Sequence, residues 1–162
     1  MNRVLASVVV SLVGCGPSHV IVLSGDLTPE IWERVGDEPA SLYVRVEGPS
    51  PETRVIGAYC PGDVALDEGV TNGGAEPTVY ESGCRDTIVA EVWLAPDSAI
   101  PSEDPLLPAL ECDDPQRLVA RDPAFAPDGW PSARVTAYPP QDGSPGLGQP
   151  CGGFRRREVV LE

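Results

Sequence analysis

The chain has 162 residues and a formal net charge of −14, because its 25 acidic residues outnumber 11 basic ones, all of them arginine. Such an acidic chain is poorly suited to a nucleic-acid backbone, which needs Lys and Arg to displace its counterions. It is equally poorly suited to adhere electrostatically to anionic lipid. We therefore expect no nucleic-acid partner, and any membrane attachment must come from another source.

The N-terminal stretch has the pattern of a secretory signal. Arg3 is followed by the uncharged, Val- and Leu-rich run from Val4 to Val13. As a helix this run would span about 15 Å, which is too short for a bilayer core of about 30 Å. A short apolar run behind a basic start directs export and is then removed. A buried strand of the folded domain is the alternative.

Leu12-Val13-Gly14-Cys15 ends this run and resembles the lipobox of bacterial lipoproteins. The resemblance covers only about the first 15 to 18 residues and implies a mode of processing, not a fold. It implies a signal peptide over residues 1–14, a diacylglycerol on the thiol of Cys15, and cleavage just before that residue. In Gram-negative members the new amino group is acylated too, and two or three chains anchor a protein durably. An ordinary signal peptide, with Cys15 as a free or paired thiol, is the alternative.

The residue after the lipobox bears on which membrane carries the protein. In well-studied lipoproteins an Asp at this position marks retention in the inner membrane, and here it is Gly16. The resemblance therefore favours the outer membrane over the inner one, in a cell-envelope location.

A lipid on Cys15 leaves an even number of cysteines, namely Cys60, Cys84, Cys112 and Cys151. An exported chain meets an oxidising compartment, so we expect two disulfides. Four cysteines allow three connectivities, and we favour Cys60–Cys84 with Cys112–Cys151. A structural metal site is not indicated, because no two cysteines have the close spacing of such sites.

After a short tether over residues 15–18, the sequence predicts one domain over residues 19–162. His19–Leu23 is a compact apolar run that predicts the first strand. Thr28–Gly36 predicts one short helix, with Thr28 as its cap, Pro29 in its first turn and Gly36 at its end. Its core-facing residues would be Ile31, Trp32 and Val35.

Alternation of apolar and polar residues predicts further strands along the chain. The strongest is Thr87–Ala95, whose Trp93 faces either a second core or the solvent, and we favour the core. Two others, Leu42–Glu47 and Arg54–Tyr59, would form a hairpin. The remaining predicted strands are Arg117–Ala120, Ala133–Tyr138 and Glu158–Leu161.

Three long irregular segments separate these strands: the Gly- and acid-rich Pro61–Pro77, the Pro-rich Pro96–Pro131 and the turn-rich Pro139–Pro150. Proline removes a ladder donor, so Pro96–Pro131, with eight prolines in 36 residues, is unsuited to regular sheet. Short strands, one small helix and two disulfides together predict a mainly β protein, an antiparallel β-sandwich that is immunoglobulin- or transthyretin-like.

Residue types needed for common catalytic mechanisms are scarce. His19 is the only histidine, and its place beside the tether predicts a solvated residue outside any catalytic triad. The absence of lysine excludes Schiff-base and Ser-Lys chemistry. We therefore expect no enzyme and no cofactor. Arg155-Arg156-Arg157, the only basic cluster, predicts a solvated strand edge, with a small anion or lipid headgroup contact as the alternative.

Carboxylates offer the remaining chemistry. Asp63, Asp67 and Glu68 share one loop with Asn72, and oxygen-rich loops suit Ca²⁺. The Pro-rich region adds the pairs Glu103-Asp104 and Asp113-Asp114. A Ca²⁺-dependent binding or adhesion module is therefore one alternative function, and a hydrolase using two carboxylates is the least favoured one.

The interpretation that the sequence favours is a membrane-anchored cell-envelope lipoprotein. Its lipid on Cys15 would hold a non-catalytic β domain that binds a protein or glycan partner or has a structural role.

Overall fold

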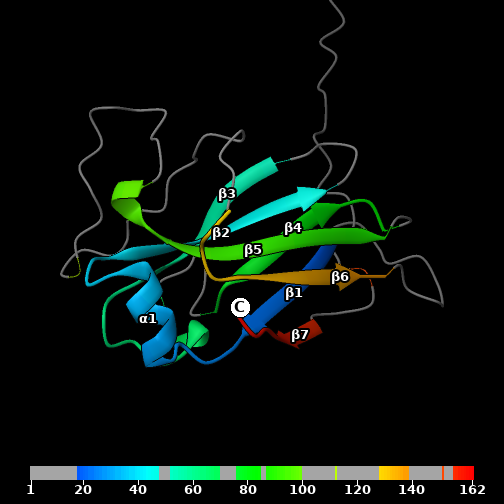
Figure 1. Ribbon diagram of the computed structural model, residues 1–162. Helices are drawn as coiled ribbons and strands as arrows, with labels where there is room; N and C mark the ends of the chain where they lie inside the picture. Colours follow the sequence, from blue (N-terminus) through cyan, green and yellow to red (C-terminus); the bar gives the residue numbers. More distant parts are fainter. Residues whose placement is uncertain are drawn as a thin grey trace, which may run out of the picture.

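The computed structural model describes residues 18–47, 52–69, 76–84, 87–99, 112, 128–138, 151 and 155–162. In these residues two β-sheets pack against each other, with one short α-helix at one end (Figure 1). The β-sandwich predicted from the sequence is thereby confirmed. The predictions for the signal, Cys15, the strand Arg117–Ala120, Asn72, most of Pro96–Pro131 and all of Pro139–Pro150 lie outside the described residues.

The three-stranded sheet has the order β4-β1-β7. Its central strand β1 (Ser18–Ser24) pairs antiparallel with β4 (Thr78–Ser82) and parallel with β7 (Arg155–Glu158). Among the described strands, β1–β7 is the parallel pair of a sandwich that is otherwise antiparallel, as expected. No strand was expected at β4, and the last strand was expected at Glu158–Leu161, whereas β7 begins at Arg155.

The four-stranded sheet has the order β3-β2-β5-β6 and is antiparallel throughout. Its strands are β2 (Ala40–Glu47), β3 (Glu52–Tyr59), β5 (Ile88–Pro96) and β6 (Ser132–Ala137). The predicted hairpin is confirmed as β2–β3. A register shift between Leu42 and Tyr43 marks a bulge in this pair, which bends the strand locally.

The predicted helix is confirmed as α1 (Pro29–Val35), and two single-turn 3₁₀ helices, η1 (Leu66–Glu68) and η2 (Asp97–Ala99), lie in the connections. Thr28 occupies the N-cap position without a side-chain capping hydrogen bond, and its hydroxyl is among the groups that lower the pKa of Glu30. Gly36 ends the helix at φ 102°, a backbone conformation that favours glycine.

Apolar side chains between the two sheets form the main core. Leu23, Leu42 and Leu94 come from three strands of the two sheets and are fully buried in it. Ile31 and Val35 add the buried face of α1, as predicted, and Trp32 packs against the core while staying partly exposed. Burial of this kind contributes about 25 cal/mol for each Å² of apolar surface and is the main force that holds the layers together.

A second, smaller apolar cluster lies on the other face of the four-stranded sheet. Tyr43 and Trp93 are cross-strand partners there, with ring centroids 5.6 Å apart. The guanidinium of Arg45 lies 5.6 Å from the centroid of the Trp93 ring, a cation–π arrangement. The prediction that Trp93 belongs to a core on the second face is therefore confirmed.

His19 contradicts its prediction, because its side chain is only 3% exposed. The strand begins one residue earlier than predicted, at Ser18. Side chains alternate across a strand, so His19 shares the inward face of β1 with the core residues Ile21 and Leu23. The only histidine is therefore buried in the sandwich and is inaccessible to a substrate.

All four predicted cysteines form disulfides, but the favoured pairing is wrong: the bonds are Cys60–Cys112 and Cys84–Cys151. Strand pairing explains the correction. Cys84 follows β4 at the end of the sandwich where Ser18 begins β1, whereas Cys60 follows β3 at the opposite end, near α1. The length of β1, about 3.3 Å per residue, separates these ends by more than the roughly 7 Å that a disulfide can bridge between Cα atoms.

Candidate functional site

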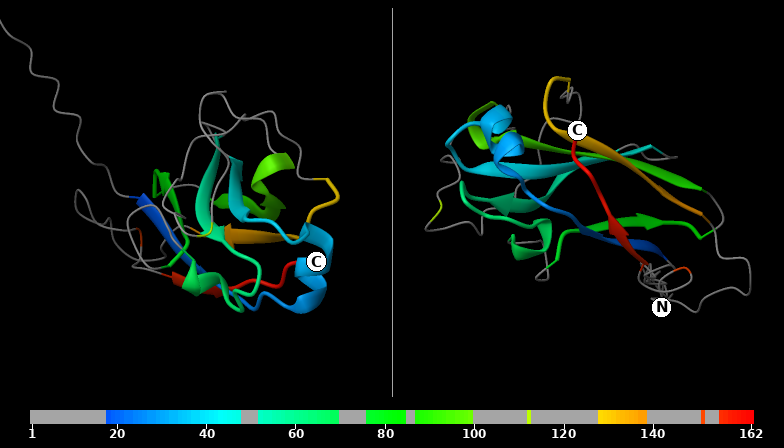
Figure 2. Two further views of the ribbon diagram at one scale, coloured as in Figure 1. Left: turned by 90° about the vertical axis from the view of Figure 1, so that its left-hand side faces the viewer. Right: turned by 60° about the horizontal axis from the view of Figure 1, so that its bottom comes forward.

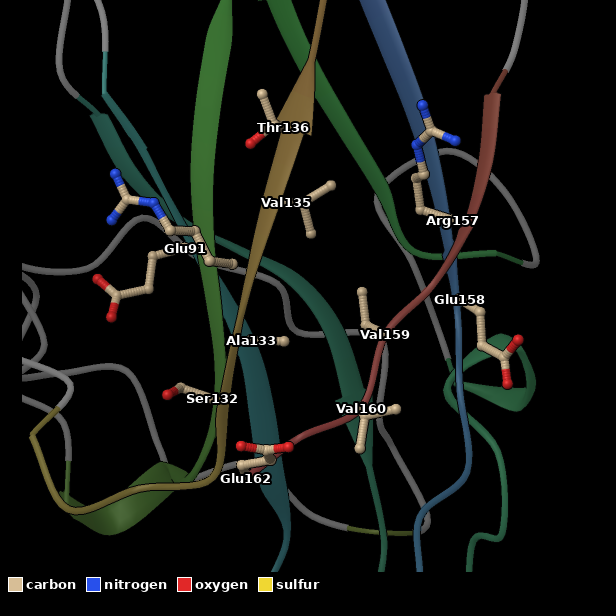
Figure 3. Close-up of a pocket in the computed structure, with 11 residues that line it drawn as sticks. Glu91, Ser132, Ala133, Val135, Thr136, Arg157, Glu158, Val159, Val160 and Glu162 are labelled. Carbon is tan, nitrogen blue, oxygen red and sulfur yellow. The ribbon is translucent and has the colours of Figure 1, made fainter.

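A groove of about 490 Å³ opens along one side of the sandwich, between β6 and the last residues of the chain. We call it the wedge. Figure 3 shows the two walls approaching each other at Ser132 and Glu162 and diverging toward Thr136 and Arg157. The wedge is lined by Glu91, residues 132–136, residues 157–160 and Glu162.

The wedge exists because the C-terminal segment passes from one sheet to the other. The backbone N–H of Val159 still donates to Ser24 O, 2.8 Å away, so the segment is attached to the end of β1 at this point. Three residues later, Glu162 and Ser132 exchange two backbone hydrogen bonds of 3.0 Å. Figure 2 shows this crossing: the red segment leaves β1 and ends beside the orange β6.

Gly25 permits the close approach between the end of β1 and the crossing segment. A Cβ atom at this position would lie 2.4 Å from Val159 O. This distance is a steric clash, so the backbone at Val159 would have to move. The carbonyl of Gly25 also accepts a hydrogen bond from Leu66 N, at 2.8 Å. One glycine therefore brings together β1, η1 and the crossing segment, and it fixes where the wedge begins to open.

The backbone of β6 presents hydrogen-bonding groups to the wedge. Pro131 O accepts from Leu94 N of β5, whereas Ser132 uses both its backbone groups on Glu162, on the other side. In an antiparallel ladder successive residues direct their N–H and C=O groups alternately to the two sides. Ala133 and Val135 therefore face β5, and the backbone groups of Arg134 and Thr136 face the wedge.

These outward groups belong to an edge strand. In the described part of the chain β6 pairs with β5 alone, and only Ser132 has a backbone partner on its other side. Two N–H and two C=O groups, from Arg134 and Thr136, thus remain outside the sheet ladder. An edge of this kind is a template for pairing with another strand.

Side chains make the interior of the wedge apolar. Ala133, Val135 and Val159 point into the space between its walls in Figure 3. Val135 and Val159 are also buried members of the main core, so the floor of the wedge is continuous with the core. No aromatic residue is among the described lining residues.

Charges are distributed unevenly along the wedge. Arg157 lies at the open end with its side chain on the groove side of β7, and Glu162 lies at the closed end (Figure 3). No described acidic residue forms an ion pair with Arg157, whereas its neighbour Arg156 contacts Glu76 and Asp67. The triple-arginine strand is therefore an exposed edge, as predicted, with one cation directed into the groove.

The acidic loop after β3 has structural partners. Asp63 accepts a hydrogen bond of 2.8 Å from Cys60 N through its Oδ2 atom, and Asp67 lies 3.8 Å from Arg156. Within the ranges the structure describes, no group of three or more His, Cys, Asp or Glu side chains is placed to hold a metal ion. The pairs Glu103-Asp104 and Asp113-Asp114 lie outside these ranges.

Tyr59 connects this loop to the core. Its ring is fully buried and its hydroxyl donates to Leu66 O. Burial raises the pKa of Tyr59 well above its ordinary value, and the carboxylates of Asp63 and Asp67 raise it further. The neutral phenol is therefore a structural hydrogen-bond donor.

A second hollow, of about 360 Å³, lies between α1 and the turn after β3. The indole N–H of Trp32 donates to Asp63 O at 2.9 Å across it, and the neighbouring Val64 is 61% exposed. The indole of Trp32 is therefore already hydrogen-bonded to the backbone of this domain. We regard the wedge as the better candidate site, because it combines a cavity with the free backbone groups of an edge strand.

No helix among the described residues has the length and apolar character needed to cross a bilayer. Comparison with protein-family models, with curated proteins and with solved structures gave no match. The likeness to immunoglobulin or transthyretin domains therefore stays a prediction. The two disulfides indicate an extracytoplasmic protein.

The wedge was not expected from the sequence, in which Ala133–Tyr138 and Glu158–Leu161 were predicted only as two strands. The signal that could have pointed to the site is the change from the charged Arg155–Arg157 to the apolar Val159–Leu161, which accompanies the departure from β1. That the second wall ends beside Ser132 depends on tertiary pairing, which sequence alone does not reveal.

Proposed function

We propose that this chain is a lipid-anchored, non-catalytic protein of the bacterial cell envelope that binds an extended segment of a partner polypeptide in the wedge. The lipobox at Leu12–Cys15 supports the anchor, and the two disulfides support an extracytoplasmic location. The lipid would keep the domain at the membrane surface. Its partner would therefore be another envelope protein.

The observation that carries the binding proposal is the free edge of β6 beside an apolar groove. Extended peptides bind sheet edges through main-chain hydrogen bonds, while pockets for alternate side chains give specificity. Arg134 and Thr136 supply those main-chain groups, and Val135 and Val159 supply an apolar floor. A polypeptide fits this combination better than a glycan, because the described lining offers no aromatic ring for a sugar to stack on.

The composition of the site favours binding over catalysis. The one histidine of the chain is buried in β1. The described lining of the wedge contributes carboxylates, arginines and small hydroxyl side chains, and it includes no histidine or cysteine.

The anchor is tested by replacing Cys15 with Ala in the native host. We expect the variant to be released from membranes or left with its signal attached, because it lacks the thiol to which the lipid would be attached. Gly16→Ala is the matched control and should stay membrane-bound. A Cys15→Ala protein that remains membrane-bound and is cut at the same place would rule out the lipid assignment.

The binding site is tested by placing a photo-reactive amino acid at Thr136, at the mouth of the wedge, in intact cells. We expect irradiation to yield a discrete adduct that protease removes, because the partner is a polypeptide. The control position is Tyr80, an exposed residue on β4 of the other sheet, from which this adduct should be absent. Equal adducts from both positions, none from Thr136, or an adduct that only a glycan-degrading enzyme removes would contradict the proposal.

A further inference from the structure

We propose that the partner segment joins β6 as an antiparallel strand that pairs with Arg134 and Thr136, and that it carries an acidic residue at its N-terminal end. This inference rests on the proposed function and specifies the partner of the same site. It identifies the occupant by backbone geometry, by the shape of the wedge and by charge.

Backbone geometry fixes the length and position of the added strand. Ser132 is already paired with Glu162 by two hydrogen bonds of 3.0 Å, so an incoming strand must stop before this residue. The next outward-facing residues are Arg134 and Thr136, because outward residues recur with a period of two. A segment of about five residues, centred opposite Val135, covers these two positions, since strands rise about 3.4 Å per residue.

The direction of the added strand follows from its neighbours. The reciprocal bonds between Ser132 and Glu162 are those of an antiparallel pair. A strand antiparallel to β6 therefore extends the pairing that the chain itself begins at the closed end. Antiparallel pairing is also slightly more stable per residue than parallel pairing. The N-terminal end of the added strand then lies at the open end, beside Arg157.

The side-chain pattern follows from the faces of β6. Val135 points into the wedge, and directly opposed residues of an antiparallel pair lie on the same face. The central residue of the added strand would therefore meet Val135 and Val159 and should be apolar. Its two neighbours, opposite Arg134 and Thr136, would face the solvent side and should be polar.

Charge fixes the ends of the added strand. Arg157 lies on the groove side of the open end and has no ion-pair partner among the described residues, so it attracts a carboxylate. Glu162 lies at the closed end and would repel one. The added strand therefore complements both charges if it has an acidic residue at its N-terminal end, beside Arg157, and a basic residue at its C-terminal end, beside Glu162.

Charge also argues against a second copy of this chain as the occupant. Joining two β6 strands edge to edge would bring two β7 strands toward each other, each with the consecutive residues Arg155, Arg156 and Arg157. Each copy's own Ser132–Glu162 pair would further limit the overlap of the two edges. If the wild type is a dimer and Thr136→Pro is a monomer, the occupant is a second copy of this chain and the assignment to a partner polypeptide is wrong.

The test uses the full chain with a donor strand fused after Glu162. A flexible Gly/Ser linker of about eight residues has a mean reach of roughly 16 Å, enough to return to the open end. The fused segment is Glu-Thr-Val-Thr-Lys, and its matched control is the charge-swapped Lys-Thr-Val-Thr-Glu. A short linker gives an effective concentration of about millimolar, which favours pairing without knowledge of the native partner.

The measurement is residue-resolved amide hydrogen exchange. We expect the Glu-first strand to slow exchange at Arg134 and Thr136 by at least about tenfold relative to the linker alone, and the Lys-first strand to slow it less. The amide of Val135, which faces β5, should be unaffected. Arg157→Glu should reverse the order of the two strands.

Each result decides a separate part of the inference. Unchanged exchange at Arg134 and Thr136 in both fusions would overturn strand addition. Equal protection by the two strands would overturn the role of Arg157. A protease-sensitive adduct at Thr136 in cells, with no protection in either fusion, would leave the binding function standing and reject this mode of binding.

Discussion

Replacing Cys84 and Cys151 together by Ala should destabilise the domain more than the same change at the other disulfide. This bond joins the end of β4 to a residue whose backbone N–H donates to Ser18 O, at the start of β1. The chain enters β7 only four residues later, at Arg155. The bond therefore holds the end of the three-stranded sheet from which β7, and with it one wall of the wedge, begins.

The magnitude follows from loop length and burial. The bond spans 67 residues, for which the loop-closure estimate is about 4.4 kcal/mol at 25 °C. Cys60–Cys112 spans 52 residues, which gives about 4.1 kcal/mol. Cys151 is 2% exposed whereas Cys112 is exposed, so its truncation also loses packing worth about 1 kcal/mol. We expect a total of about 5 kcal/mol against about 4 kcal/mol.

The assay is guanidinium unfolding of the purified, oxidised full chain, followed by circular dichroism. A loss of about 5 kcal/mol is a large part of the 5 to 15 kcal/mol typical of single domains, so the midpoint should fall sharply. The Cys60→Ala/Cys112→Ala variant is the matched control. A Cys84→Ala/Cys151→Ala variant as stable as the wild type, or more stable than this control, would refute the reasoning.

Three further predictions concern single residues. Gly25→Ala should destabilise the domain by about 1 to 3 kcal/mol, because its Cβ would meet Val159 O at 2.4 Å; an unchanged melting midpoint would contradict this. Raising the pH above about 10, the ordinary pKa of tyrosine, should destabilise the wild type by up to about 1.4 kcal/mol per pH unit, because burial raises the pKa of Tyr59 and only the unfolded state loses that proton. Tyr59→Phe should reduce this slope, and equal slopes from pH 8 to 11 in both proteins would contradict the role given to Tyr59. Thr136→Pro should be tolerated while Val135→Pro unfolds the sheet, since only the N–H of Val135 bonds to β5; equal loss of folded protein in both variants would show that the edge has been assigned to the wrong residues.

Much of the fold could be predicted from local patterns. Alternation in Leu42–Glu47 and Thr87–Ala95 predicted two strands, because each must bury one face against the core. The structure then places them side by side as the central strands β2 and β5. Proline at position 29 and glycine at position 36 marked the limits of the helix. The prediction that Trp93 is buried was also confirmed, because on the second face of the sheet it packs with Tyr43, Val55 and Trp130.

What failed depended on contacts between distant parts of the chain. Cys60 and Cys84 are close in sequence, yet strand pairing places them at opposite ends of the sandwich. His19 was placed beside the tether because nothing local shows that β1 already begins at Ser18. The wedge was missed for the same reason, since it depends on the crossing of the last residues from β1 to Ser132.

The most direct test of the account is residue-resolved amide exchange along β6 in the isolated protein, before any partner or fused strand is added. If β6 is a free edge, exchange alternates along it: it is slow at Ala133 and Val135, which bond to β5, and fast at Arg134 and Thr136, which face the wedge. Slow exchange at all four amides, or the opposite alternation, would contradict the free edge on which the proposed binding depends.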